Sequence, residues 1–99
     1  MSFSNYGFIM KDAAYSQPKK SELKVDGFIT TVYCVGNNEV AGKAANDMAD
    51  AGAQLVELCG AFNEDDVKEI IDAVNGKTAI GFASMSEDQL NLFLSKINA

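Results

Sequence analysis

The chain of 99 residues contains no histidine and no tryptophan, one proline and two cysteines. Without histidine it lacks the commonest general base and the commonest metal ligand of proteins. Two cysteines are too few for a disulfide scaffold, and each lies in an apolar run, as buried free cysteines often do. We therefore expect no metal site, no cofactor and no disulfide framework.

Basic residues are also scarce, with 8 lysines and arginines against 14 acidic residues and a formal net charge of −6. Nucleic acids and anionic membranes are bound through clusters of basic side chains, and the only such cluster here is Lys19, Lys20 and Lys24. The longest apolar run, near residues 28–35, is far too short to span a bilayer. The first residues lack the positive charge of a signal peptide. We expect a cytoplasmic protein that binds neither nucleic acid nor membrane.

Hydrophobic residues make up 47% of the chain, which is enough for a folded core. The length is that of one domain and too short for two ordinary ones, so we predict a single domain over residues 1–99. A chain this small leaves much of its surface exposed. We therefore expect a homo-oligomer, in which contacts between subunits add to the burial that one chain achieves.

Four segments rich in apolar, β-branched and aromatic residues predict strands. They cover residues 6–10 (YGFIM), 27–35 (GFITTVYCV), 53–59 (AQLVELC) and 77–83 (KTAIGFA). Residues 11–24, between the first two, are polar and contain the only proline, Pro18. We interpret residues 11–24 as a mobile connection with a helical turn after Pro18.

Three segments with apolar residues at helical spacing follow the second, third and fourth predicted strands. The first helix is predicted over residues 39–51 and ends at Gly52. The second follows a capping box of Asn63 with Asp66, and the third follows a capping box of Ser86 with Gln89. The third helix is expected to close the core with its apolar face, which consists of Leu90, Phe93, Leu94 and Ile97.

The alternation of strands and helices implies parallel strands joined by right-handed crossovers. The predicted fold is therefore a small α/β domain with a four-stranded, mostly parallel sheet and three helices. We prefer a flavodoxin-like strand order 2-1-3-4. A sequential order 1-2-3-4, as in a fragment of a (βα) barrel, and a ferredoxin-like α+β sheet with an antiparallel first strand are the alternatives.

Residues 55–62 (LVELCGAF), followed by a helix and then by residues 79–82 (AIGF), resemble a family of small uncharacterised bacterial α/β proteins. Members of that family carry an Ile-Glu-Leu-Cys-Gly-Gly-Phe-like signature at the end of a strand. The resemblance covers roughly residues 6–82 in length and element order, and it is specific in the Glu-Leu-Cys-Gly stretch. Ala61 replaces the second glycine. The resemblance implies the α/β fold, marks Glu57, Cys59 and Gly60 as positions of interest, and implies no activity.

Ligands of open α/β sheets bind outside the carboxyl ends of the strands. Polar or reactive residues at the ends of the last three predicted strands are therefore the candidate ligand-binding residues. They are Cys34, Asn37, Glu57, Gly60, Asn63 and Ser84.

Glu57 is a candidate catalytic residue because it interrupts an apolar strand, on the same face as Leu55 and Cys59. A buried carboxylate must be paired, hydrogen-bonded or protonated. Burial that raised its pKa would suit Glu57 to general-base catalysis. A structural partner, such as a backbone amide, a lysine or a second subunit, is the commoner explanation for such a residue.

Cys59 is the second catalytic candidate, because it precedes the amino end of the helix that Asn63 caps. A helix dipole at that position lowers the pKa of a thiol and favours the nucleophilic thiolate. The chain has no histidine to act as its base, and a buried structural cysteine is the commoner case. A bond between Cys34 and Cys59 depends on a distance that the sequence does not supply.

Three functions agree with these features. We first predict a small-molecule-binding or regulatory module, with a pocket at the strand ends and with Glu57 and Asn63 as polar anchors. The second is a small enzyme that uses Glu57 as acid and base with the help of Cys59. The third is a structural or protein-interaction domain. This fold class hosts all three, so the fold alone does not decide between them.

Overall fold

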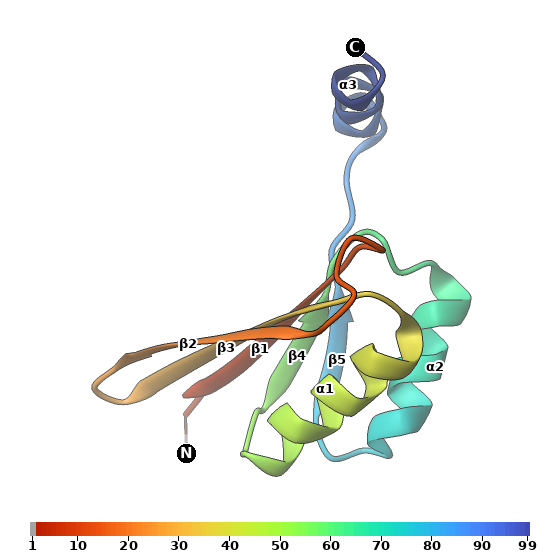
Figure 1. Ribbon diagram of the computed structural model, residues 1–99. Helices are drawn as coiled ribbons and strands as arrows, with labels where there is room; N and C mark the ends of the chain where they lie inside the picture. The colour runs from red at the N-terminus through yellow and green to blue at the C-terminus, as the bar shows by residue number, and fades with distance from the viewer. Residues whose placement is uncertain (1) are drawn as a thin grey trace.

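One mixed sheet of five strands, in the order β2-β3-β1-β4-β5, forms the centre of the computed structural model, which describes residues 2–99 (Figure 1). The strands are β1 (Asn5–Lys11), β2 (Lys19–Val25), β3 (Phe28–Val35), β4 (Leu55–Leu58) and β5 (Ala79–Phe82). Strand β1 pairs in parallel with β3 on one side and with β4 on the other, and β5 runs parallel to β4. Only β2 is antiparallel to its neighbour, β3.

The predicted α/β class is confirmed, and the four predicted strands lie in the preferred order. They correspond to β1, β3, β4 and β5, which are neighbours in the order β3-β1-β4-β5. The prediction of four strands is wrong, because residues 11–24 contain a fifth strand, β2, in place of a mobile connection. Neither the sequential order nor an antiparallel first strand is found.

Strands β2 and β3 form a hairpin. Val25 pairs directly with Phe28, so the two residues between them, Asp26 and Gly27, make the turn. Gly27 has a φ of +85°, a conformation that glycine adopts without steric strain. All seven residues of β2 are exposed. Such an edge strand needs no apolar run, because it is held by its hydrogen bonds to β3 and because its lysine side chains can remain in water.

Three helices complete the domain: α1 (Asn38–Asp50), α2 (Glu64–Val74) and α3 (Glu87–Ile97). Helix α1 ends before Gly52, which has a φ of +100°, as expected for a helix stop. At the start of α2 the predicted capping box is confirmed, since Asn63 and Asp66 each bond to the backbone N–H of the other. The capping box predicted at Ser86 is wrong, because the Ser86 side chain makes no cap hydrogen bond.

The core lies between the sheet and helices α1 and α2, which both cover the same face (Figure 1). Alanines on the inner side of α1 allow its backbone to approach the strands closely. At Gly7 of β1, an added Cβ would lie 2.5 Å from the Met48 sulfur of α1, so a larger residue here would require the Met48 side chain to move. The fully buried larger side chains are Ile9, Val35, Val56, Leu58, Ile70 and Val74.

The opposite face of the sheet, here called the open face, has no helix over it. Because Gly7 faces α1, its neighbours Tyr6 and Phe8 point to the open face, and so do the residues paired with them. Helix α3 does not cover this face. Every residue of α3 is exposed, and the molecule measures 44 × 27 × 23 Å. The expectation that α3 closes the core of its own chain is therefore wrong (Figure 1).

None of the three helices within residues 2–99 has the length and apolar character needed to cross a membrane.

Candidate functional site

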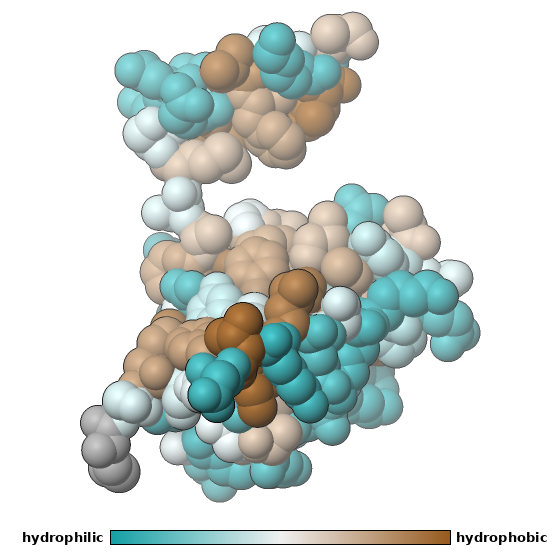
Figure 2. All heavy atoms as spheres, turned by 90° about the vertical axis from the view of Figure 1, so that its left-hand side faces the viewer, coloured by the Kyte–Doolittle hydropathy of each residue, from teal (hydrophilic) through white to brown (hydrophobic). Residues whose placement is uncertain are grey.

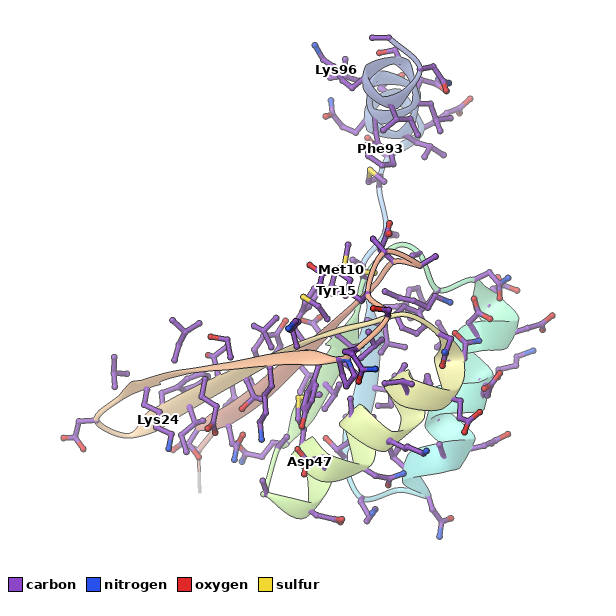
Figure 3. All side chains as sticks on the ribbon, viewed as in Figure 1. Met10, Tyr15, Lys24, Asp47, Phe93 and Lys96 are labelled. Atoms are coloured by element: carbon purple, nitrogen blue, oxygen red, sulfur yellow. The ribbon has the colours of Figure 1, made fainter. Side chains whose placement is uncertain are left out.

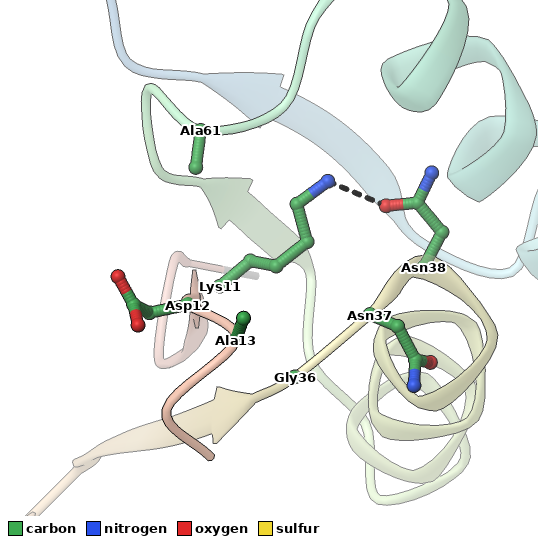
Figure 4. Close-up of a pocket in the computed structure, with 7 residues that line it drawn as sticks. All are labelled: Lys11, Asp12, Ala13, Gly36, Asn37, Asn38 and Ala61. Carbon is green, nitrogen blue, oxygen red and sulfur yellow. Dashed lines mark hydrogen bonds between the residues drawn. The ribbon is translucent and has the colours of Figure 1, made fainter. Parts of the chain in front are cut away.

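The carboxyl ends of β1, β3 and β4 meet at one edge of the sheet, because these three strands are adjacent and parallel. A cavity of about 570 Å³, wide open to solvent, lies there (Figure 4). Its lining comes from the end of β1, the start of α1 and the loop after β4, and consists of Lys11, Asp12, Ala13, Gly36, Asn37, Asn38 and Ala61.

Asp12 and Ala13 form one wall of this cavity, and the loop that they begin, residues 12–18, is held by backbone hydrogen bonds. The Asp12 N–H donates to Val35 O at 2.9 Å, and the Tyr15 N–H donates to Asp12 O at 3.0 Å. The Tyr15 carbonyl oxygen lies so close to Gly36 that an added Cβ would be only 2.3 Å from it. Glycine at position 36 thus allows the loop to pack directly against the segment that leads into α1.

Lys11 contributes a positively charged ammonium group to the lining of the cavity. Its Nζ donates to Asn38 Oδ1 at 2.7 Å and contacts Asp66 Oδ2 at 3.2 Å (Figure 4). The same Nζ lies 4.3 Å from the centre of the Phe62 ring, within range of a cation–π contact. The Lys11 and Asp66 side chains are only 16% and 21% exposed, so water screens their attraction less than at an open surface.

Asp66 connects the start of α2 with the start of α1 and the end of β1. Asn38 Nδ2 donates to Asp66 Oδ1 at 2.6 Å, and the backbone N–H of Asn63 donates to Asp66 Oδ2 at 3.0 Å. These two hydrogen bonds, together with the Lys11 ammonium, hold the pKa of Asp66 below its ordinary value of 3.8. The network fixes the two helix starts relative to the sheet and leaves Lys11 in a defined position.

The predicted ligand-binding residues lie in several places. Asn37 lines the cavity and caps α1, because its side chain accepts from the Val40 N–H at 2.9 Å. Gly60 is next to the lining residue Ala61, and Asn63 caps α2. Ser84 is exposed in the segment between β5 and α3. Of these predicted residues, Asn37 is the one that contributes to the lining.

Glu57 is half-buried on the open face of the sheet and outside the lining of the cavity. The Tyr6 hydroxyl donates to Glu57 Oε1 at 2.7 Å. Burial, followed by the hydrogen bond to Glu57 and the charge of that carboxylate, raises the pKa of Tyr6 to about 12. The partner of Glu57 is therefore a phenol from the neighbouring strand.

The two cysteines flank β1 on opposite sides and are both free thiols. Cys34 of β3 is paired with Met10 of β1. On the other side of β1, Cys59 follows β4, and its sulfur accepts a hydrogen bond from the Lys11 N–H at 3.3 Å. Two strand spacings, about 10 Å, separate their strands, which is more than a disulfide spans. Cys34 also lies beside Tyr15, and its hydrogen bond raises the pKa of that phenol.

Lys11 and Asp12 line the cavity but are not among the predicted site residues, whereas Asn38 directly follows the predicted binding residue Asn37 at the end of its strand. A signal for Lys11 and Asp12 was present, because both directly follow the first predicted strand at residues 6–10. The predicted ligand-binding residues all lie at the ends of the other three predicted strands. Within residues 2–99, no three Cys, Asp or Glu side chains are grouped closely enough to hold a metal ion.

The sheet and its two covering helices define an α/β domain with a cavity at the carboxyl ends of its parallel strands. The model of a family of unknown function (DUF6506) matches residues 4–97, and the chain belongs to this family. The match includes β1 through α3, which is more than the residues 6–82 of the resemblance seen in the sequence. No curated protein and no solved structure matches the chain. The strand-end signature at Glu57, Cys59 and Gly60 stays a prediction.

Proposed function

We propose that this protein is a small-molecule-binding module whose ligand occupies the cavity at the ends of β1, β3 and β4. The observation that carries the proposal is the cavity itself, which has a volume of about 570 Å³ and several polar side chains around one rim. The loop packed on Gly36 and the network around Lys11 support it, because both preform the walls without a ligand. A preformed cavity lowers the entropic cost of binding.

The lining indicates the chemistry of the ligand. It offers the Lys11 ammonium, the Asp12 carboxylate and the amides of Asn37 and Asn38, so it combines donors with acceptors. The Lys11 charge is already balanced by Asp66, and a phosphate would be repelled by the carboxylates of Asp12 and Asp66. We therefore propose a small neutral or zwitterionic polar molecule, such as an amino acid or a polyol, as the ligand class.

An enzyme that uses Glu57 with Cys59 has less support. Glu57 points to the open face of the sheet and already accepts a hydrogen bond from Tyr6, and neither Glu57 nor Cys59 lines the cavity. The regulatory role that a binding module can have depends on the identity of the ligand, so the first experiment is a search for that ligand.

The test is a thermal-shift screen of the full chain against amino acids, polyols and sugar phosphates. A ligand that binds only the native state stabilises it by about 2.7 kcal/mol at a hundredfold excess over its dissociation constant. Ala13 lines the cavity and Ala14 does not, although both are exposed and adjacent. The variant Ala13→Phe fills part of the cavity, and Ala14→Phe is its matched control.

We expect a neutral or zwitterionic compound to raise the melting temperature of the wild type and of Ala14→Phe, with a smaller shift in Ala13→Phe. Equal shifts in the two variants would place binding elsewhere and overturn the proposed site. Stabilisation by sugar phosphates alone would overturn the ligand class. A screen without any hit would leave the cavity without a function and would contradict the proposal.

A further inference from the structure

Helix α3 presents an apolar face that contacts nothing within its own chain. Leu90, Phe93, Leu94 and Ile97 recur at helical spacing and are 41%, 48%, 41% and 61% exposed. Asp88 and Lys96 lie outside this stripe, whereas Glu87 lies at its amino end, in line with Leu90 and Leu94. Figure 2 shows α3 as a separate body with apolar atoms on its surface, and in Figure 3 Phe93 lies well beyond Met10 and Tyr15 at the end of the sheet.

The open face of the sheet is a second apolar surface without a partner. The paired residues Phe8 and Val32 lie at its centre. Phe3 extends the surface by packing edge-on against Phe28, with the ring centres 5.2 Å apart. Further apolar side chains on this face are Met10, Leu23 and Val25. Phe3, Leu23 and Val25 are 51%, 62% and 73% exposed, and contiguous exposed apolar side chains often mark an interaction surface.

We propose that α3 of one molecule packs on the open face of a second copy of this chain, and that the exchange is reciprocal. Each copy carries one unpartnered helix face and one unpartnered sheet face, so two copies related by a two-fold axis bury all four surfaces. The radius of gyration of 14.2 Å exceeds the value of about 13 Å expected for a compact chain of 100 residues, because α3 extends from the body.

The path of the chain favours a second copy over the sheet of the same molecule. The Ala83 N–H donates to Leu58 O at 2.8 Å, so the chain leaves β5 in the strand direction, and Ser86 is still extended. Residues 83–86 contain neither glycine nor proline to turn the chain back. Strand β3, with much of the apolar surface, lies three strand spacings, about 14 Å, from β5. Four residues span at most about 14 Å, so they would reach β3 only if they ran fully extended across the sheet, whereas they continue along the direction of β5.

The sheet next to β5 gives an additional reason. On the open face β5 presents only Ala79 and Gly81, which offer almost no apolar surface to a helix of the same chain. The main apolar surface lies over β1, β3 and β2. A helix from another molecule reaches it without this constraint. The carboxylate of Glu57, which lies beside Phe8 on this face, already has the Tyr6 hydroxyl as a partner.

The test is the mass of the full chain in solution, measured by light scattering and by sedimentation. We expect two chains per particle for the wild type and one for Leu90→Asp and Phe93→Asp. Leu92 is the matched control, because it is 49% exposed but points away from the centre of the apolar stripe. Leu92→Asp should remain a dimer. These helix variants should leave the body folded, since α3 does not contact it.

A second variant tests the sheet side of the contact. Val32→Asp, checked for folding by circular dichroism, should also give a single chain per particle. A dimer in Val32→Asp would mean that α3 pairs with something other than the open face and would overturn the proposal. A wild type that is monomeric, because α3 binds its own sheet or a different protein, would overturn it as well. So would a dimer that survives both substitutions in the apolar stripe of α3.

Discussion

The pair of Tyr6 and Glu57 shows how a single polar contact is accommodated on an otherwise apolar sheet face. Glu57 is half-buried, and its nearest donor is the Tyr6 hydroxyl at 2.7 Å. Without that donor the carboxylate would lose a hydrogen bond that the apolar neighbours on the sheet do not replace. The contact therefore allows a charged residue in the middle of β4.

Tyr6→Phe tests this contact by removing only the hydroxyl. We expect the free energy of unfolding to fall by about 1 kcal/mol, the typical net value of one partly exposed hydrogen bond. Urea unfolding of Tyr6→Phe, Glu57→Gln and the double variant measures the coupling between the two side chains. If the effects of the two single substitutions simply add, the pair does not stabilise the fold.

The raised pKa of Tyr6 predicts a pH dependence at the alkaline end. Its pKa is about 12 in the folded chain, above the ordinary value of 10.0. Because the folded state favours the protonated phenol, this stabilisation is complete below pH 10 and is lost as the pH rises toward 12. The stability difference between the wild type and Tyr6→Phe should shrink across that range. An ultraviolet titration counts the tyrosines that ionise near pH 12. If Tyr6→Phe has as many of them as the wild type, the assignment is wrong.

At the scale of the elements, the loop at residues 12–18 depends on one glycine. A Cβ at Gly36 would lie 2.3 Å from a backbone oxygen of the loop, and backbone cannot rotate away as a side chain does. Gly36→Ala should therefore lower the free energy of unfolding by more than about 2 kcal/mol or displace the loop. Gly60→Ala is the control, since its Cβ would meet only the Ala83 carbonyl oxygen at 4.0 Å. Similar stabilities of both variants in urea would show that the close packing of the loop is not required.

The strands differ in how well their sequences identify them. Strand β3 consists of apolar, aromatic and β-branched residues, and this composition predicts a strand. Strand β2 contains Lys19, Lys20 and Lys24, and its polar composition is typical of a connection. Its two apolar residues, Leu23 and Val25, alternate with charged ones, and the Asp-Gly turn that follows is typical of hairpins. Composition alone misses such a strand because its stability comes from pairing with β3, outside its own segment.

The candidate site was predictable as a location but only partly as a set of side chains. The predicted strand order brings the ends of β1, β3 and β4 together, and the cavity lies there. Alternation in β4 places Glu57 and Leu58 on opposite faces, but it does not tell which face the helices cover. That depends on the packing of α1 against Gly7, which is a tertiary contact.

At the scale of the whole molecule, α3 shows that an amphipathic pattern does not name its partner. The spacing of Leu90, Phe93, Leu94 and Ile97 correctly predicts a helix with one apolar face. The same spacing results whether that face packs on its own chain or on another. The path of residues 83–86 decides between packing on its own chain and packing on another, and that path is not predicted by a local sequence signal.

The reciprocal exchange of α3 predicts that thermal stability depends on protein concentration. A dimer that dissociates on unfolding is stabilised by mass action, so its melting temperature rises with the concentration of the chain. We expect a measurable increase in calorimetry over a hundredfold range of wild-type concentration, and none in Phe93→Asp. A melting temperature of the wild type that does not change with concentration would mean that the chain unfolds as a monomer.

The position of β1 in the sheet also affects the order in which the protein can assemble while it is synthesised. Of these five strands, β1 is synthesised before the others, yet it is the central strand, and both of its neighbours, β3 and β4, come later. A nascent chain that ends before Leu55 can pair β1 on one side only. Long-range pairing of this kind is slow to form, because distant segments must first meet. The sheet is therefore complete only after β5 has been made, and of the three helices described here α3 is made last.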